Sequence, residues 1–459
     1  MIYRHVRPAA LVMTLVASFG VSPATAQDAQ APQRRGDQGL FQGGPGNERG
    51  DVLFLTASAY ESYDDNIVGE QTLGVATPDP TFQSSGLYSG GDATLFYGRR
   101  SDRVRFGANA GASLQYYPRL DDLTQTSYHT GADLSVVRGR RTFLASQSAS
   151  WLPFFVLGSV PVVTPNPVII DPGSVFTPPL AGNQDLAVFS EGSSSYQTGL
   201  GFTQGIGRRS SFTLNYGLSV SDLSGGLADL TDHSARATLN VPVSRYVSLR
   251  AGYGYQDSKY DTTEGLKQNV NQEVNAGVQY QRALSATRSI AFGVGTGVSV
   301  LRREEENHPE LGVRRHNQAL GSANFTYVFH RTWRAGAEYR RALQLLQGVS
   351  QPFFSNDVSA NLVGRLSRRV DVVGSVGYSQ GAIAVDSLTR DHDTRAGSVR
   401  LRYALTSRMA VTGEYAYYSY NFSRQVVLPQ GVVGKLDRQV VRVGLVVGVP
   451  LLRGRAARP

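Results

Sequence analysis

The sequence predicts an all-β fold, a transmembrane antiparallel up-and-down β-barrel of the bacterial outer membrane with about 18 strands. Three observations lead to this prediction. Apolar and polar residues alternate along many segments of about ten residues, and short polar turns alternate with longer connections. In addition, no run of about 18 apolar residues could form a membrane-spanning helix.

The N-terminal residues have the features of a signal peptide. Arg4 and Arg7 precede a short apolar stretch, and Ala24-Thr25-Ala26 matches the small-residue pattern of a cleavage site. We expect residues 1–26 to direct export in a Gram-negative bacterium and to be removed after Ala26. The apolar stretch is too short to anchor the chain in a membrane.

Three further segments follow the signal peptide. Residues 27–50 are rich in Gln, Gly, Pro and Arg and offer little to bury, which predicts a flexible periplasmic linker. Residues 51–450 contain the alternating segments and form the predicted barrel, and residues 451–459 form a basic C-terminal tail.

Segment 103–117 shows the alternation. Its even-numbered residues are apolar from Val104 to Tyr116, whereas its odd-numbered residues are mostly polar or glycine. Successive side chains of a strand point to opposite faces, so this segment has one face suited to lipid and one suited to water. The same pattern recurs at 212–220, 247–256, 273–280, 398–405 and 441–449.

Connections of two kinds separate the strands. Short polar turns recur roughly every 40 residues, as in an internal hairpin repeat. They lie at 99–101, 139–141, 207–209, 244–245, 285–288, 330–331, 367–369 and 407–408. Longer connections lie at 64–85, 118–127, 153–193, 222–231, 259–268, 303–314, 346–354, 383–391 and 422–436. Eight short turns, with both ends of the barrel on their side, imply nine hairpins and therefore 18 strands. A β-propeller has a similar repeat but would not alternate loop lengths in this way.

Composition excludes several classes of site. The chain has no cysteine, so disulfides and thiolate chemistry are ruled out. The net charge is +9, but the basic residues are spread along the chain, and we expect no nucleic-acid partner. Histidines are scattered without metal-ligand spacing, so we expect no metal. Gly293, Gly295 and Gly297 alternate along a strand and do not open a helix, and no serine-centred motif stands out, so we expect no cofactor and no catalytic residue. The acidic segment 304–310 is interpreted as a solvated loop.

Arginines dominate the face that should line the lumen. In the predicted register they are Arg103, Arg105, Arg236, Arg250, Arg334, Arg340, Arg365, Arg400, Arg402 and Arg442. The acids on that face are fewer: Asp92, Asp133, Glu273, Glu338, Asp357 and Glu414. A net-positive lining concentrates anions and favours anionic solutes. The alternative is that the arginines pair with these acids across strands and only stiffen the wall.

The longest connection, 153–193, is rich in proline, which forbids a regular helix or central strand. It could fold into the barrel as a constriction, or it could lie over the rim or against a partner.

The end of the first predicted strand carries Tyr63, Asp64, Asp65 and Asn66, followed by Ile67. This motif, together with the repeated hairpins and their Ser/Arg turns, resembles the β-barrel porin 2 family over roughly 51–450. The resemblance implies an outer-membrane barrel, in many cases encoded among genes for exopolysaccharide synthesis and export.

Three functions are compatible with these observations. The first is a non-enzymatic, porin-like channel for anionic solutes or for export of an acidic exopolysaccharide, in contact with outer-membrane lipid and lipopolysaccharide and served by periplasmic export machinery. The second is an occluded structural or adhesive barrel that binds polymer through its extracellular loops. The third is an outer-membrane hydrolase or lipid A-modifying enzyme, for which no serine-centred motif is evident. Fold alone does not choose between them.

Overall fold

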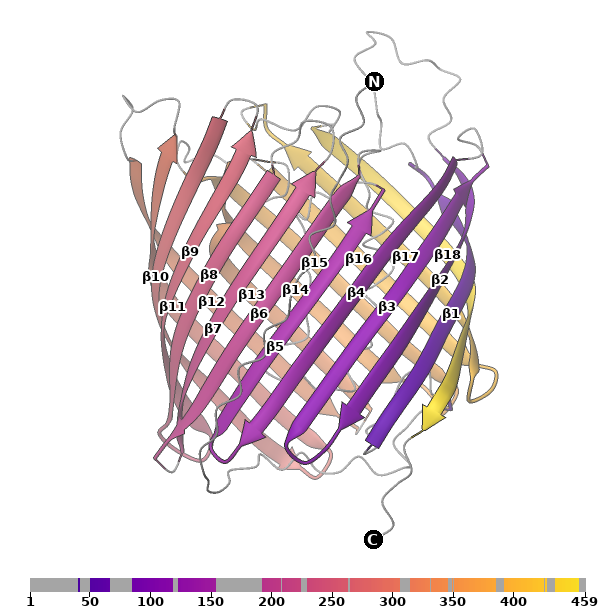
Figure 1. The fold of residues 1–459 in the computed structure, drawn as a ribbon, viewed down its shortest axis with the longest axis horizontal. Coiled ribbons are helices and arrows are strands. Elements are labelled where there is room, and N and C mark those ends of the chain that lie inside the picture. Colours follow the sequence, from indigo (N-terminus) through magenta and orange to yellow (C-terminus); the bar gives the residue numbers. More distant parts are fainter. Residues whose placement is uncertain are drawn as a thin grey trace, which may run out of the picture.

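The computed structural model is a closed barrel of 18 antiparallel strands (Figure 1). The structure describes residues 40–41, 50–66, 85–118, 123–153, 192–207, 209–223, 229–262, 265–305, 314–330, 332–345, 349, 351–384, 392–424, 426 and 434–453. The signal peptide, most of connection 153–193 and the last residues of the basic tail lie outside these ranges.

The strands follow one another around the barrel in chain order. They are β1 (Gly50–Asp64), β2 (Gly86–Arg100), β3 (Val104–Tyr117), β4 (Leu123–Arg138), β5 (Arg141–Leu152), β6 (Ser193–Ile206), β7 (Ser210–Leu223), β8 (Asp229–Pro242), β9 (Val247–Thr262), β10 (Gly265–Ser285), β11 (Arg288–Glu305), β12 (Arg314–Phe329), β13 (Trp333–Gln344), β14 (Phe353–Arg365), β15 (Val370–Ile383), β16 (His392–Ala404), β17 (Met409–Phe422) and β18 (Lys435–Arg453). Each strand pairs antiparallel with the next, and β1 also pairs with β18. The predicted fold class and the predicted number of strands are therefore confirmed.

The two kinds of connection lie at opposite ends of the barrel. All eight predicted short turns join consecutive strands at the end where β1 begins and β18 finishes, at the bottom of Figure 1. We call this the short-turn end and the opposite one the long-loop end. Gly139 and Gly207 have φ angles of 60° and 62°, which glycine adopts readily in tight turns.

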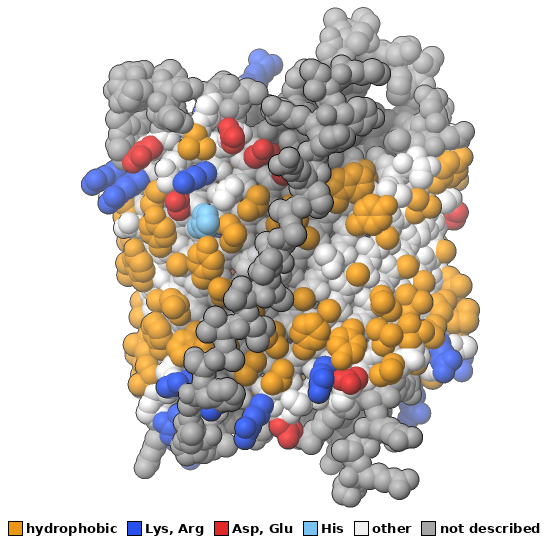
Figure 2. Space-filling view, viewed as in Figure 1, with side chains coloured by type: hydrophobic (Ala, Val, Ile, Leu, Met, Phe, Trp, Pro, Cys, Tyr) orange, Lys and Arg blue, Asp and Glu red, His pale blue; other side chains and the backbone are white. Residues whose placement is uncertain are grey.

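The outer face is apolar between two polar rims. In β3, Val104, Leu114 and Tyr116 are exposed on the outside, whereas Ser113 and Gln115 are buried on the inside. The predicted register of this strand is thus correct. Figure 2 shows apolar side chains over the wall and most charged side chains near its upper and lower edges. Such an apolar band suits contact with the hydrocarbon layer of a membrane. The closed barrel also pairs the backbone hydrogen-bonding groups of its strands with one another, as the hydrocarbon layer requires.

Aromatic rings gather near both edges of this band. At the long-loop end, the ring of Tyr128 lies 5.9 Å from that of Trp151. At the short-turn end, Trp333 stacks on Phe329 at 5.9 Å, and Tyr280 stacks on Phe292 at 4.9 Å. Aromatic side chains at two such levels are typical of the girdles of membrane barrels.

The strand boundaries differ from the predicted segment boundaries. Gly50 belongs to β1 rather than to the linker, and β18 continues through Pro450 to Arg453 rather than ending before the tail. The irregular pairing between Leu53 and Phe54 of β1 explains why β18 tolerates a proline, since prolines in sheets occur at bulges and edges.

Two residues of the predicted flexible linker contact the barrel. The Leu40 amide donates a hydrogen bond to the Arg368 carbonyl at 2.7 Å. Phe41 is buried against Ala404 and Ala410 at the short-turn end. The composition of the linker gave no sign of this contact. In the described residues, no helix is both long enough and apolar enough to cross a membrane.

Candidate functional site: the inner wall

The structure places nine of the ten predicted lumen arginines in strands, on the side that alternates away from the exposed apolar face. Arg103 is the exception. It lies in the turn before β3, which begins at Val104, and so belongs to the exposed rim of the barrel rather than to its wall. The prediction counted Arg103 into the strand because the alternation of residue types continues through the turn.

Three of these arginines are paired with acids, two of them across neighbouring strands and one, Arg236, across the intervening strand β9. Arg236 of β8 forms an ion pair with Glu273 of β10. Arg400 of β16 donates from Nε to Glu414 of β17 at 3.1 Å, and both side chains are largely buried. Arg402 donates from Nε and Nη2 to Asp371 Oδ2 of β15 at 3.0 and 2.8 Å. For these residues the stiffening alternative describes the contacts better than a free positive charge.

Arg442 of β18 is buried and does not line an open lumen. Its Nε donates to Ser62 Oγ and its Nη2 to Tyr88 OH, both at 3.1 Å. Its guanidinium carbon lies 4.0 Å from the centre of the Tyr60 ring. The two hydroxyl groups and the aromatic face stabilise the buried guanidinium. Since Tyr60 and Ser62 belong to β1 and Tyr88 to β2, Arg442 links the last strand to the first two.

The family-like motif forms the seam that closes the barrel. Asp64 is fully buried and forms an ion pair with buried Arg438 of β18, whose Nε lies 2.8 Å from Oδ2. Asp65 exchanges hydrogen bonds with the Gln439 backbone: its Oδ1 accepts at 2.6 Å and its amide donates at 3.1 Å. The Asn66 backbone amide donates to Asp64 Oδ1, and its Nδ2 donates to the Asp437 carbonyl. Tyr63 points outward and is exposed.

A second group of inward arginines lies close to the short-turn end. Arg105, Arg250, Arg334 and Arg365 each lie within four residues of that end of their strands. Arg105 faces another arginine, Arg100, across the β2–β3 pair. Among the described residues, no ion pair joins any of these four to a carboxylate. We call them the mouth arginines.

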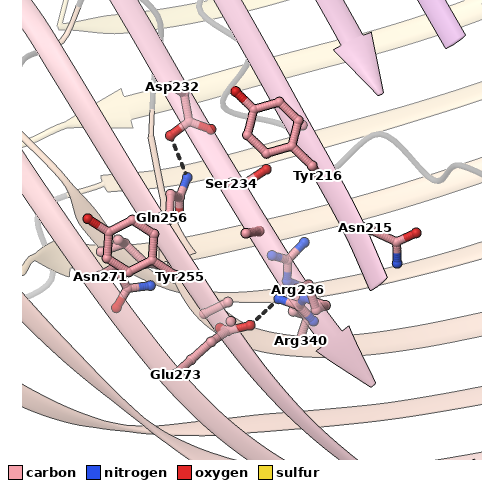
Figure 3. Close-up of a pocket in the computed structure, with 15 residues that line it drawn as sticks. Asn215, Tyr216, Asp232, Ser234, Arg236, Tyr255, Gln256, Asn271, Glu273 and Arg340 are labelled. Carbon is pink, nitrogen blue, oxygen red and sulfur yellow. Dashed lines mark hydrogen bonds and ion pairs between the residues drawn. The ribbon is translucent and has the colours of Figure 1, made fainter. Parts of the chain in front are cut away.

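The tenth arginine, Arg340 of β13, lines a cavity of about 370 Å³ on the inner wall. Arg236, Glu273, Asp232 and Gln256 line the same cavity, and Figure 3 shows the contact of Arg236 with Glu273 and that of Gln256 with Asp232. The remaining polar lining includes Asn215, Ser234 and Asn271. We call this space the inner-wall cavity.

Several described inward side chains are buried toward the long-loop end. Several large side chains there are less than 2% exposed: Tyr88, Tyr260, Leu301, Phe353, His392, Tyr420 and Leu436. Phe353 packs edge-on against His392, which stacks on Phe422. The mouth arginines Arg250 and Arg334, by contrast, are exposed.

Sequence reasoning missed several residues of the wall. Arg438 and its ion pair with Asp64 were not predicted, although Arg438 alternates in phase with Arg442 and that phase was a usable signal. Asp371, Asp232 and the amides of the cavity were also missed, since single polar residues on a strand carry no local pattern. Among the described residues, no group of three histidines or acids could hold a metal ion.

No protein-family model matches the chain, and no curated protein matches it. The resemblance to the β-barrel porin 2 family therefore stays a prediction. Several solved structures are similar in outline over most of their length. OccK11 (OpdR) of Pseudomonas aeruginosa is 12% identical, with 90% of this chain and 98% of that chain covered and a TM-score of 0.43. OccAB2 of Acinetobacter baumannii is 10% identical, with 89% and 100% covered and a TM-score of 0.45. OpdL of Pseudomonas aeruginosa is 11% identical, with 88% and 99% covered and a TM-score of 0.44. Because these TM-scores lie below 0.5, the fold assignment rests on the strand pairing of this chain itself.

Proposed function

We propose that the protein is a non-enzymatic channel of the bacterial outer membrane that favours anionic solutes, with acidic exopolysaccharide as one candidate cargo. The apolar outer band and the two aromatic belts support a place in a membrane. Outer-membrane barrels have short turns on the periplasmic side and longer loops outside. The short-turn end would therefore face the periplasm, where export machinery would deliver cargo, and the long-loop end would face lipopolysaccharide and the exterior.

The observation that carries this proposal is the group of mouth arginines. A paired arginine leaves little net charge in the lumen, whereas none of Arg105, Arg250, Arg334 and Arg365 forms an ion pair with a described carboxylate. Asp371 faces Arg365 in the register of β14 and β15, but that carboxylate pairs with Arg402. A single charge about 10 Å away contributes roughly 0.4 kcal/mol in water, or about a twofold change in local anion concentration before screening. Several arginines around one mouth act together on the same ion.

The test is ion selectivity in a planar bilayer, measured as the reversal potential across a salt gradient at low ionic strength. We expect the refolded mature protein to conduct with anion preference, and the variant Arg250→Ala with Arg334→Ala to lose much of that preference. The difference should shrink at high salt, because the screening length falls from about 10 Å at 0.1 M to about 3 Å at 1 M.

Arg282→Ala is the matched control. Arg282 lies near the same end of the barrel but on the outer face, with its guanidinium 5.3 Å from the Tyr246 ring. Its removal should leave the reversal potential unchanged. An equal loss in both variants, or cation preference in the unaltered protein, contradicts the role of the mouth arginines.

The buried long-loop end of the inner wall favours a second candidate, an occluded barrel that binds surface polymer from outside. The two candidates differ in the same bilayer experiment. A folded barrel that inserts and stays electrically silent would support the occluded barrel and contradict the channel.

A further inference from the structure

The inner-wall cavity has features of a ligand site that the mouth arginines lack. Five strands contribute to its lining: Asn215 comes from β7, Arg236 from β8, Gln256 from β9, Glu273 from β10 and Arg340 from β13. Its volume of about 370 Å³ falls in the range of about 300–1,000 Å³ typical of small-molecule sites.

Several of its polar groups are held in place by neighbours. Asp232 Oδ1 accepts hydrogen bonds from Gln256 Nε2 at 2.9 Å and from Ser258 Oγ at 2.6 Å. The ion pair with Arg236 fixes Glu273 (Figure 3). Such preorganised groups lose little freedom when a ligand binds.

Arg340 differs from the other cavity cation, Arg236. No hydrogen bond or ion pair to a described residue engages its guanidinium. Asp357 faces it in the register of β13 and β14, but that carboxylate already accepts hydrogen bonds from Ser379 Oγ at 2.6 Å and Ser355 Oγ at 3.1 Å. Arg340 thus presents donors to the cavity.

The charges exclude a general anion site. The two arginines of the lining are balanced by two acids, Asp232 and Glu273, so a compact anion such as phosphate gains little. Carboxylate oxygens accept hydrogen bonds only, whereas amides both donate and accept. A ligand with several hydroxyl groups satisfies this mixture, because each hydroxyl can donate to Asp232 or Glu273 and accept from Gln256 or Asn271.

We propose that the inner-wall cavity binds a sugar acid, either free or as a unit of a chain, with the ring hydroxyls on Asp232, Gln256 and Asn271 and the carboxylate on Arg340. A planar guanidinium and a carboxylate form two parallel hydrogen bonds, which fixes the orientation of the sugar. This inference rests on the proposed function, because the sugar acid would reach the cavity through the lumen of the channel.

The test is a saturation-transfer NMR titration of the detergent-solubilised mature protein with D-glucuronate, D-glucose and phosphate. We expect glucuronate to bind more tightly than glucose, and phosphate to compete poorly. Arg340→Gln should raise the Kd for glucuronate about tenfold or more, the size expected for losing a hydrogen bond to a charged group, and should change the Kd for glucose little. Gln256→Ala should weaken both sugars.

Arg282→Ala serves again as the control, and heat-dependent gel mobility verifies that each variant is folded. The proposal is overturned by a folded Arg340→Gln protein that binds glucuronate as well as the unaltered one, by phosphate that competes as strongly as glucuronate, or by absence of glucuronate binding. The titration measures binding, and the bilayer experiment measures conduction separately. A barrel that binds glucuronate but does not conduct contradicts only the channel. A barrel that conducts but does not bind glucuronate contradicts only the sugar-acid site.

Discussion

At the scale of single residues, Asp64 and Arg438 give the sharpest prediction about stability. The exposed fractions of their side chains are 0% and 3%, so removing one partner takes from the other buried charge the ion pair that stabilises it. We expect Asp64→Asn to lower the free energy of unfolding by about 3–5 kcal/mol. Denaturant titration in detergent micelles measures this change.

Two further variants compare the buried Asp64–Arg438 ion pair with an exposed one. Replacing both partners by apolar residues, as in Asp64→Leu with Arg438→Met, should restore much of the stability, since no charge is then left unpaired. Asp393→Asn breaks the Arg395–Asp393 pair, in which the arginine side chain is 62% exposed, and should cost less than about 1 kcal/mol. Equal losses for Asp64→Asn and Asp393→Asn would mean that the seam contributes no more than a surface contact.

At the scale of elements, Gly364 and Trp333 form a close contact on the outer face between β13 and β14. A Cβ atom at Gly364 would clash with Cε3 of Trp333, so the indole covers the glycine and any side chain there must displace it. We expect Gly364→Ala to cost about 1–3 kcal/mol in stability and to change the Trp333 fluorescence, as overpacking does in cores.

Gly374→Ala on β15 is the matched control for this contact. The nearest atom to a Cβ at Gly374 is the Ser398 carbonyl oxygen at 3.8 Å, an ordinary van der Waals distance. This variant should keep its stability within about 0.5 kcal/mol. If the two alanine variants behave alike, Trp333 moves aside freely and the girdle at this position is loosely packed.

The elements also show what the sequence could predict. Alternation with a period of two and the Ser/Arg turns report local geometry, so strands such as β3 and turns such as 139–141 were predicted at nearly their observed places. Partners across strands depend on the register of distant segments. The pairing of Arg402 with Asp371, 31 residues away, was therefore not predictable from either strand alone. The inner-wall cavity was not predictable for the same reason, because its lining comes from β7 to β10 and from β13, which β11 and β12 separate from β10.

At the scale of the whole molecule, the barrel carries its two tryptophans near opposite edges of the apolar band. The sequence contains only two, Trp151 near the long-loop end of β5 and Trp333 at the short-turn end of β13, and each packs against aromatic neighbours. Since tryptophan prefers the level of the lipid headgroups, a barrel that spans the bilayer should hold both indoles at that level.

Depth-dependent fluorescence quenching tests this arrangement with the single-tryptophan variants Trp151→Phe and Trp333→Phe in vesicles. We expect a quencher attached near the headgroup to act more strongly than one near the end of the acyl chain, and to a similar degree for both variants. A soluble quencher added only outside the vesicles should then reach one indole and spare the other, because a membrane-spanning barrel places them on opposite sides. Quenching of both from one side would mean that the barrel lies on the membrane instead of crossing it, and would remove the basis for a channel.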